Sequence, residues 1–248
     1  MIQDLHSHTY YSFCGKDRPE AIVEAAIEGG IEVFGICDHN YGVGFGSYSA
    51  FAAPPELIPN RYEGRNLRRY FDHINLIKEK YADRIRILRG IEIATDSSAG
   101  KVTLPPDADI SFFDYCLIEH IDRDATSVAD LFAFAKRCGC PLVGVAHTDL
   151  FGYCEKTGQD PCEFFSKMAE AGIFWEMNVS YDSIHGYKEH EYMLRFFASE
   201  KEQDLIRRSG VRLSVGFDGH RVEDYRPDRV RDYCERVKAL GIGLVLDE

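Results

Sequence analysis

The stretch V-F-G-I-C-D-H, residues 33–39, joins a short apolar run to an acidic residue and a histidine. An apolar run of this length, bounded by polar residues, predicts a buried strand. Comparable runs recur along the whole chain, so the sequence predicts a series of buried strands. They are Ile2–Leu5, Val33–Cys37, Ile85–Ile91, Tyr115–Ile118, Leu142–Val145, Ile173–Met177 and Leu213–Gly216, with Ile242–Leu246 as a candidate for the last one.

Longer amphipathic stretches between these runs predict helices. They lie near Pro19–Glu28, Arg65–Tyr81, Ser127–Arg137, Pro161–Ala171, Glu189–Arg208 and Glu223–Leu240. Repeated strand–helix units predict a parallel sheet, and seven or eight such units favour a closed barrel over an open sheet. No Pro- or Ser-rich linker divides the chain, so we expect residues 1–248 to form a single α/β domain.

The composition is that of a water-soluble domain with a substantial core, since 45% of the 248 residues are hydrophobic and 28% are charged. The chain has no stretch of 18 apolar residues, and its first residues resemble no secretory signal, so we expect no membrane association. Eight scattered cysteines without Cys-x-x-Cys spacing favour reduced thiols in the cytoplasm.

The net charge of −12 disfavours extended binding to a nucleic-acid backbone. It is compatible with a small phosphorylated substrate if divalent cations reverse the sign of the charge at the binding site. A long irregular segment at residues 40–64 is rich in Gly, Pro and aromatic residues. Loops of this length inside a compact domain are commonly functional, so it is a candidate substrate lid, with an ordered surface loop as the alternative.

Residues of the metal-binding types follow most of the predicted strands. Because the active sites of α/β barrels are built at the carboxyl ends of their strands, we expect these side chains to converge. His6 and His8 are two residues apart and therefore share a face of an extended chain. The other strand-end groups are Asp38 and His39, Glu92, Glu119 and His120, His147, and Asp218 and His220.

Six of the nine histidines thus lie directly after predicted strands. Imidazole and carboxylate ligands suit Zn, Fe or Mn, and the lack of a four-ligand cysteine pattern argues against a structural zinc knot. Glu92 is the natural bridge between two ions. Asp4 is a candidate acceptor that orients one of the first two imidazoles.

The order His-x-His, Asp-His, Glu, His, His, Asp-x-His resembles the PHP family, named for polymerase and histidinol phosphatase. The resemblance extends from D-L-H-S-H-T at residues 4–9 to G-F-D-G-H at residues 216–220. It implies a distorted (β/α)7 barrel that carries two to three divalent metal ions. The implied ligands are His6, His8, Glu92 and Asp218 for one ion, Glu92, His120 and His147 for a second, and His39 and His220 for a third.

The sequence departs from the family pattern at two places. Members of the family often supply a further His or Asp for the third ion, and here Cys14 occupies that position. Either the Cys14 thiolate is a ligand, or nearby Asp17 is, or the third site is weak. The second departure is Phe217, where many relatives carry a small polar residue, and we expect it to affect packing.

The leading hypothesis is hydrolysis of a small phosphate monoester, as in histidinol phosphatases, by a metal-activated hydroxide. Lys16, Arg18 and Arg221 are candidate cations for the phosphoryl group, and Arg221 is favoured because it directly follows a ligand. The alternatives are a nuclease or cyclic-phosphate phosphodiesterase and, in another class, a non-catalytic metal-binding regulatory module.

Two further roles follow from residues at strand ends. Asp38 or His39 is a candidate for the group that protonates the leaving oxygen. Asn178 ends a predicted strand and is expected to hydrogen-bond to the substrate or to a ligand, with a strand-end cap as the alternative.

Overall fold

The computed structural model describes residues 1–44, 65–95, 104, 108–122 and 131–247. Within them, seven parallel strands pair in the order of the chain, each with the next. The strands are β1 Gln3–Asp4, β2 Val33–Ile36, β3 Arg86–Ile93, β4 Tyr115–Ile118, β5 Val143–Val145, β6 Ile173–Asn178 and β7 Leu213–Gly216.

Backbone hydrogen bonds between the first and the last strand regions close this sheet. The amide of Leu5 donates to the carbonyl of Val215 at 3.0 Å, and farther along the amide of His8 donates to the carbonyl of Gly219 at 2.8 Å. The sheet is therefore a barrel, and the predicted distorted (β/α)7 fold is confirmed.

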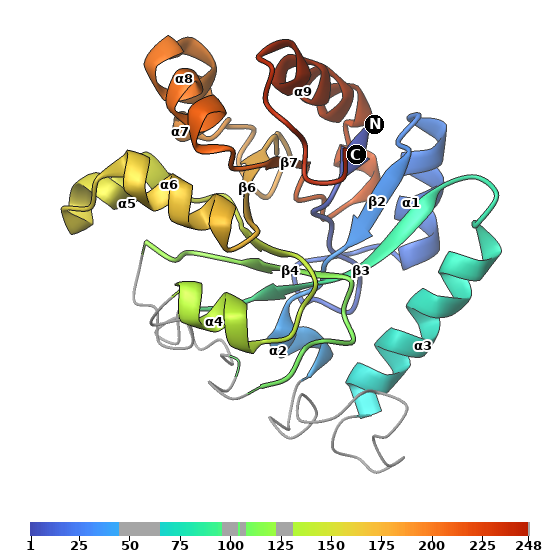
Figure 1. The fold of residues 1–248 in the computed structure, drawn as a ribbon. Coiled ribbons are helices and arrows are strands. Elements are labelled where there is room, and N and C mark those ends of the chain that lie inside the picture. The colour runs from blue at the N-terminus through green and yellow to red at the C-terminus, as the bar shows by residue number, and fades with distance from the viewer. Residues whose placement is uncertain (45–64, 96–103, 105–107, 123–130, 248) are drawn as a thin grey trace.

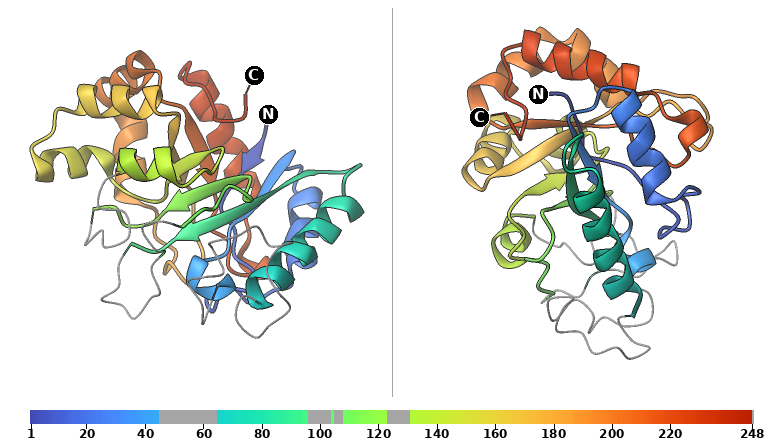
Figure 2. Two further views of the ribbon diagram at one scale, coloured as in Figure 1. Left: turned by 60° about the horizontal axis from the view of Figure 1, so that its bottom comes forward. Right: turned by 90° about the vertical axis from the view of Figure 1, so that its right-hand side faces the viewer.

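Helices surround the strands (Figure 1), and the two turned views show them on several sides of the sheet (Figure 2). They are α1 Pro19–Glu28, α2 Asn40–Val43, α3 Arg65–Lys80, α4 Leu131–Arg137, α5 Leu150–Thr157, α6 Pro161–Glu170, α7 Glu191–Ala198, α8 Glu200–Ser209 and α9 Pro227–Ala239, with the 3-10 turn η3 Val222–Asp224. No described helix combines the length and the apolar character that crossing a membrane requires.

Two helix predictions were too long. The predicted helix at 189–208 is split at Ser199, whose extended backbone ends α7 and whose side chain accepts a hydrogen bond from the amide of Glu202 to begin α8. The predicted helix at 223–240 begins only at Pro227, since proline is accommodated in a first helical turn and not in the middle of a helix.

Other predictions missed or misplaced elements. The suggested eighth strand at 242–246 is wrong, because its only strand-like pairing among the described residues is one bridge between Leu244 and Leu213. Helix α5 was missed; it begins where the Asp149 side chain accepts a hydrogen bond from the amide of Gly152. Most of the candidate lid at 40–64 lies outside the described residues. So do residues 127–130, the start of the helix predicted at 127–137.

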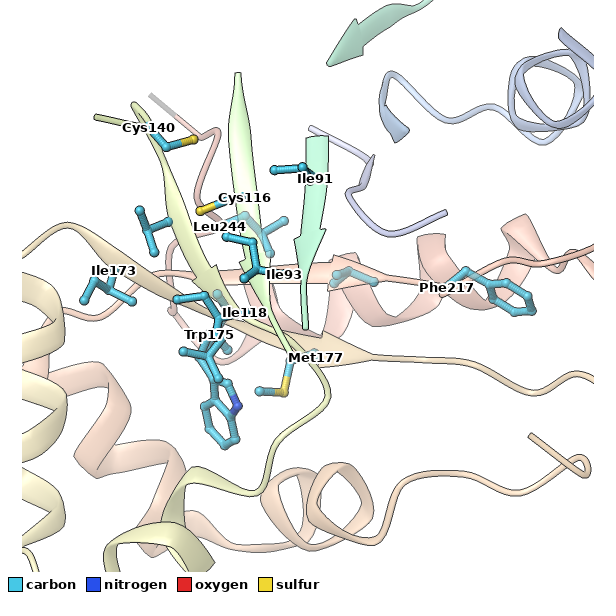
Figure 3. Packing of buried hydrophobic residues seen from close by; sticks show 14 of the residues in the cluster. Ile91, Ile93, Cys116, Ile118, Cys140, Ile173, Trp175, Met177, Phe217 and Leu244 are labelled. Atoms are coloured by element: carbon cyan, nitrogen blue, oxygen red, sulfur yellow. The ribbon is translucent and has the colours of Figure 1, made fainter. Parts of the chain in front are cut away.

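The larger part of the core lies between the strands and the helices. Figure 3 shows members of this layer along neighbouring strands, among them Ile91 and Ile93 of β3, Cys116 and Ile118 of β4, and Trp175 of β6. All of these side chains are buried. They are the residues that face the helices on alternate positions of each strand.

A second, smaller cluster fills the interior of the barrel, and we call it the barrel plug. Its buried members are Leu5, Val33, Cys37, Leu88, Tyr115, Leu117, Ala146, Phe174 and Val245. The Tyr115 hydroxyl crosses the interior and donates to the carbonyl of Leu5 at 2.7 Å. Gly90 makes room for this ring, because a Cβ atom there would lie 2.3 Å from the Cζ atom of Tyr115.

Candidate metal centre

A pocket of about 280 Å³ lies where the predicted ligands meet at the carboxyl ends of the strands. Three carboxylates, Glu92, Glu119 and Asp218, contribute to its wall. Seven of the nine histidines of the chain also line it: His8, His39, His120, His147, His185, His190 and His220.

Glu92 is at the centre of this group. It lies near the carboxyl end of β3, on the face of the strand that it shares with Leu88 and Gly90 and that points into the barrel. Four imidazoles surround its carboxylate. The distances to its oxygens are 2.9 Å from His39 Nδ1, 3.0 Å from His147 Nε2, 3.3 Å from His6 Nε2 and 3.4 Å from His8 Nε2.

Asp218 forms a second convergence point after β7. Its Oδ1 atom lies 3.1 Å from His8 Nε2 and 3.5 Å from His6 Nε2, so the first two imidazoles face both carboxylates. The same oxygen is 3.6 Å from His220 Nε2, whereas Oδ2 is 3.2 Å from His185 Nε2. Acids and imidazoles from distant parts of the chain therefore meet around one space.

The electrostatics of this group fit divalent cations. Burial alone would raise the pKa of Glu92, but the imidazoles of His39 and His6 hold it well below its usual range. Burial opposes charge on His39 too, yet Glu92 raises its pKa to about 10. Without cations, the buried acids thus require protonated imidazoles beside them. Divalent cations bound by neutral imidazoles would compensate the same negative charges. The donor set of imidazole nitrogen and carboxylate oxygen suits Zn, Mn or Fe.

Three of the predicted ligands have an unusual backbone conformation. His120, His147 and Asp218 have φ angles of 51°, 21° and 57°, in the region that disfavours residues other than glycine. Hydrogen bonds hold the chain there: Asp218 donates its amide to the carbonyl of His6 at 2.8 Å, and the Thr95 hydroxyl donates to the carbonyl of His120 at 3.1 Å. Such strain commonly accompanies a functional site.

His120 lies at the outer edge of the group. Its ring centroid is 4.9 Å from that of His147, and its Nε2 atom is 3.5 Å from Glu119 Oε2. Glu119 is buried, and one of its oxygens also lies 3.9 Å from His39 Nδ1. The acid that directly precedes His120 therefore belongs to the same cluster.

Glu176 is a member of the site that the sequence reasoning did not identify. It is buried on β6, with one oxygen 2.7 Å from His6 Nδ1 and the other accepting from the amide of His147 at 2.8 Å. Gly216 makes room for it, since a Cβ atom there would lie 2.2 Å from Glu176 Oε1. The signal in the sequence was a charged residue within an otherwise apolar strand, F-W-E-M.

The segment after β6 adds a second unpredicted group. Asp182 is buried, with Oδ1 at 2.7 Å from His185 Nδ1 and Oδ2 at 3.5 Å from His220 Nδ1. His190 also lines the pocket, and its ring stacks 6.2 Å from that of His147. In the sequence, His185 and His190 were two of the three histidines without an assigned role; the third, His73, lies on α3 and pairs with Glu20.

Cys14 and Asp17 lie in different surroundings. The Cys14 sulfur and ligand atoms of His8 and His220 all lie within 4.8 Å of one another. Burial alone would raise the pKa of this thiol, but His220 and His39 bring it below its ordinary value. Asp17 instead accepts a hydrogen bond from the amide of Val222 at 2.7 Å. The geometry places the thiol, and not the carboxylate, beside the third group of predicted ligands.

The three predicted cations lie away from the pocket wall. Lys16 and Arg221 line a separate hollow of about 430 Å³ together with Asp17 and residues 222–223. The Arg221 guanidinium lies 3.4 Å from Glu223, and Lys16 is exposed. Arg18 is exposed directly before α1. None of the three cationic side chains therefore lines the pocket where the candidate ligands meet.

Asp38 and Asp4 are buried groups that organise the backbone. Asp38 accepts from the hydroxyls of Thr9 and Ser12 at 2.7 Å each, and it does not line the pocket. Of the two candidate proton donors, only His39 faces the pocket. Asp4 accepts from the amides of His6 and Phe217, at 3.2 and 3.0 Å. The expectation that Asp4 orients an imidazole is wrong, because Glu176 occupies that position.

Asn178 and Phe217 complete the set of residues chosen from the sequence. The Asn178 amide nitrogen donates to Glu176 at 3.3 Å and to Asp218 at 3.4 Å, so it contacts the acids of the site and does not line the pocket. Phe217 is buried and meets the ring of Tyr225 edge-on at 5.2 Å. Its contribution is therefore to packing, as predicted.

The family model of the PHP domain matches residues 4–220. A crystal structure of histidinol phosphate phosphatase from Lactococcus lactis, complexed with zinc, L-histidinol and phosphate, aligns with a TM-score of 0.57 and 16% identity over 98% of this chain and 95% of that one. A candidate histidinol phosphatase from Listeria monocytogenes aligns with a TM-score of 0.51 and 17% identity over 90% and 96%. Among curated proteins, no sequence matches the chain.

Proposed function

Because this chain belongs to the PHP domain family and is a metal-dependent phosphoesterase, we propose that it hydrolyses a small phosphate monoester. The observation that supports this proposal best is the Glu92 carboxylate, which four imidazoles surround at the wall of the pocket. A carboxylate with ligand atoms on both sides is suited to bridge two cations. The histidinol phosphatase from L. lactis, which shares the fold, suggests histidinol phosphate as the first ester to test.

We assign the candidate ligands to three positions. His6, His8, Glu92 and Asp218 would hold one ion, and Glu92 with His120 and His147 would hold a second. Cys14, His39 and His220 would hold a third. Bound divalent ions would lower the pKa of water and neutralise charge on the phosphoryl oxygens. Zinc, manganese and iron all suit the first two positions.

Neighbouring residues of this chain hold the candidate ligands in place. Glu176 keeps His6 oriented through Nδ1, which leaves Nε2 directed at Glu92 and Asp218. His8 has its pKa lowered to about 3, chiefly by burial, so its imidazole is neutral and able to act as a ligand at physiological pH. The strained backbone at His147 and Asp218 fixes two further ligands before substrate arrives.

The size and charge of the molecule favour a small ester over a polymer. The pocket of about 280 Å³ is near the lower end of small-molecule sites, and the described part of its wall contains no Lys or Arg. The net charge of −12 disfavours an extended polynucleotide. All eight cysteines are free thiols, which supports a reducing, cytoplasmic location as part of the proposal.

A substrate panel tests this proposal. The protein is purified, its bound metals are measured, and histidinol phosphate, other phosphomonoesters, cyclic nucleotides and single-stranded DNA are assayed side by side. We expect turnover of monoesters and none of DNA. Turnover confined to DNA or cyclic phosphates would favour the phosphodiesterase alternative. Inactivity of the zinc, manganese and iron forms on every ester would favour a binding module and overturn the proposal.

A further inference from the structure

One of the three candidate metal positions differs from the others in the chemistry of its ligands. The Cys14 sulfur lies with ligand atoms of His8 and His220 in a group whose members are all within 4.8 Å of one another. Three other groups of this size at the centre contain only imidazoles and carboxylates: His6 with His147 and Asp218, His6 with His8 and Glu92, and His39 with Glu92 and Glu119. Among the described residues, therefore, only one of the candidate metal positions has a sulfur atom among its potential ligands.

The histidine beside this thiol is held in a fixed orientation. His220 Nδ1 faces the buried Asp182 carboxylate at 3.5 Å, while its Nε2 atom points toward Asp218 at 3.6 Å. The His8 ring stacks against it with centroids 4.7 Å apart. A carboxylate on one ring nitrogen directs the other nitrogen to a metal, as is common for metal-ligating histidines. Asp182 is itself fixed by His185, at 2.7 Å.

This arrangement distinguishes Asp182 from a ligand. Asp182, His185 and His220 also form a close group of potential ligands. His220 has two ring nitrogens: Nδ1 faces Asp182, and Nε2 faces Asp218 at the centre of the cluster. A single imidazole binds a cation through one nitrogen and donates a hydrogen bond through the other. Asp182 is therefore a positioning residue for the position that contains the thiol.

Sulfur and oxygen ligands select different metals. A thiolate is a soft ligand that favours zinc, whereas carboxylate and imidazole also accept manganese and iron. Divalent manganese is the weakest binder of the first-row series at nitrogen and sulfur sites, so a position with one thiolate disfavours it most strongly. Zinc readily accepts tetrahedral sites with mixed Cys and His ligands.

We propose that the position formed by Cys14, His220 and a neighbouring imidazole, that of His8 or of the His39 ring stacked on it, selects zinc. The two positions without sulfur also accept manganese or iron. The centre then holds two kinds of metal whenever both are available. This inference rests on the proposed function, because it assumes that the cluster is a metal centre. It concerns which ion each position takes, so it can fail while the hydrolase assignment stands.

Reconstitution of the metal-free protein tests the proposal. The protein is stripped with a chelator, loaded with Zn²⁺ alone or Mn²⁺ alone, desalted, and its ions per chain are counted by elemental mass spectrometry. We expect about one ion fewer per chain with manganese than with zinc. Loading with Co²⁺ should produce a thiolate-to-cobalt charge-transfer band in the near ultraviolet. Equal occupancy by zinc and manganese, or a cobalt form without this band, would overturn the inference.

Variants test whether Cys14 is the source of the zinc selectivity. Cys14→Ser should abolish the cobalt band and lower zinc content by about one ion per chain. Cys14→His should retain the zinc and bring manganese occupancy up to the same level. Cys162→Ser is the matched control, because Cys162 is an exposed thiol on α6, and it should change neither measurement. A cobalt band that persists in Cys14→Ser would contradict the assignment.

The phosphomonoester assay, run on the same samples, separates this inference from the proposed function. Turnover by a wild-type protein whose cobalt form lacks the band would refute the zinc-selective position alone. A cobalt band and zinc selectivity in a protein that hydrolyses none of the esters would refute the hydrolase proposal alone. Failure to bind any of these metals would refute both.

Discussion

The two ends of the barrel interior are built from the same rows of side chains and yet have opposite chemistry. On β3, Leu88 belongs to the barrel plug and Glu92, four residues later on the same face, is at the centre of the candidate metal site. On β6 the row begins with Phe174 in the plug and continues to Glu176 beside His6. On these two strands, the row of side chains that faces the barrel interior is therefore apolar at one end and acidic at the other.

The difference shows how stability and activity are divided in this molecule. The plug is held by apolar contacts and by the hydrogen bond from Tyr115 to Leu5, so it needs no partner from outside the chain. The opposite end buries acids and imidazoles, whose desolvation is unfavourable until cations offset it. We expect changes in the plug to alter folding and changes in the metal centre to alter metal binding and turnover.

The largest effect should come from Glu92→Ala. This change removes the carboxylate that four imidazoles face, so metal content and phosphoesterase turnover should fall together, with turnover reduced by at least about 100-fold. Circular dichroism should show an intact fold, because the plug is untouched. Glu170→Ala, at an exposed position of α6, is the control. Wild-type turnover in Glu92→Ala would contradict the central role of this carboxylate.

A smaller effect is expected for Glu176→Gln. The amide keeps the shape of the side chain but removes the charge that orients His6 and accepts from the amide of His147. Metal affinity should fall by about 10–100-fold, measured by titration of the metal-free protein. Excess metal should restore part of the turnover, which distinguishes this residue from Glu92. Glu235→Gln, at an exposed site on α9, should leave the affinity unchanged.

Beside the barrel plug, Gly90→Ala should affect folding alone. The added Cβ atom would lie 2.3 Å from the Tyr115 ring, so it forces a shift in the interior and should cost about 1–3 kcal/mol of unfolding free energy. Denaturant unfolding of the metal-free protein measures this loss. Gly243→Ala is the matched control, since its Cβ would approach Arg212 only to 4.0 Å. Loss of metal ions in Gly90→Ala would show that the two ends are not independent.

The smallest effect concerns the outer wall of the barrel. Burial would raise the pKa of Asp114. Hydrogen bonds from Arg89, and to a lesser extent from Lys78, instead lower it to about 2, below its ordinary value of 3.8. A depressed pKa stabilises the folded state above the unfolded pKa, and this contribution is lost as the pH falls from about 4 to 2. Asp114→Asn should therefore cost about 1–2 kcal/mol at pH 7 in the metal-free protein.

The pH dependence of that difference is the sharper measurement. The gap in unfolding free energy between wild type and Asp114→Asn should shrink as the pH is lowered toward 2, because the wild-type carboxyl is then protonated. Asp72→Asn is a suitable comparison, since Asp72 forms an exposed pair with Arg68 that should contribute little. A gap that stays constant with pH would mean that the ion pair is not its source.

Local sequence patterns identified much of this architecture. Short apolar runs located strands such as β2 and β4, whose residues are all buried, because a strand buried on both faces is apolar along its length. The same runs marked where His6, Glu92 and His147 would lie, because parallel strands present their carboxyl ends on one face of a barrel. The failures were local as well: a helix break at Ser199 and a start at Pro227 depend on capping that a hydrophobic pattern does not reveal.

The residues that contact the predicted ligands could be identified only from the closed barrel. Glu176 reaches His6 across 170 positions of the chain, and Asp182 reaches His220 from a segment with no strand signal. Short-range spacing fixes which side chains share a face of one strand, whereas contacts between strands depend on register and on the room that Gly216 leaves. Residue order therefore specified the ligand types and their strand ends. The folded barrel alone selected which buried carboxylate holds each imidazole, because that choice depends on distances in space.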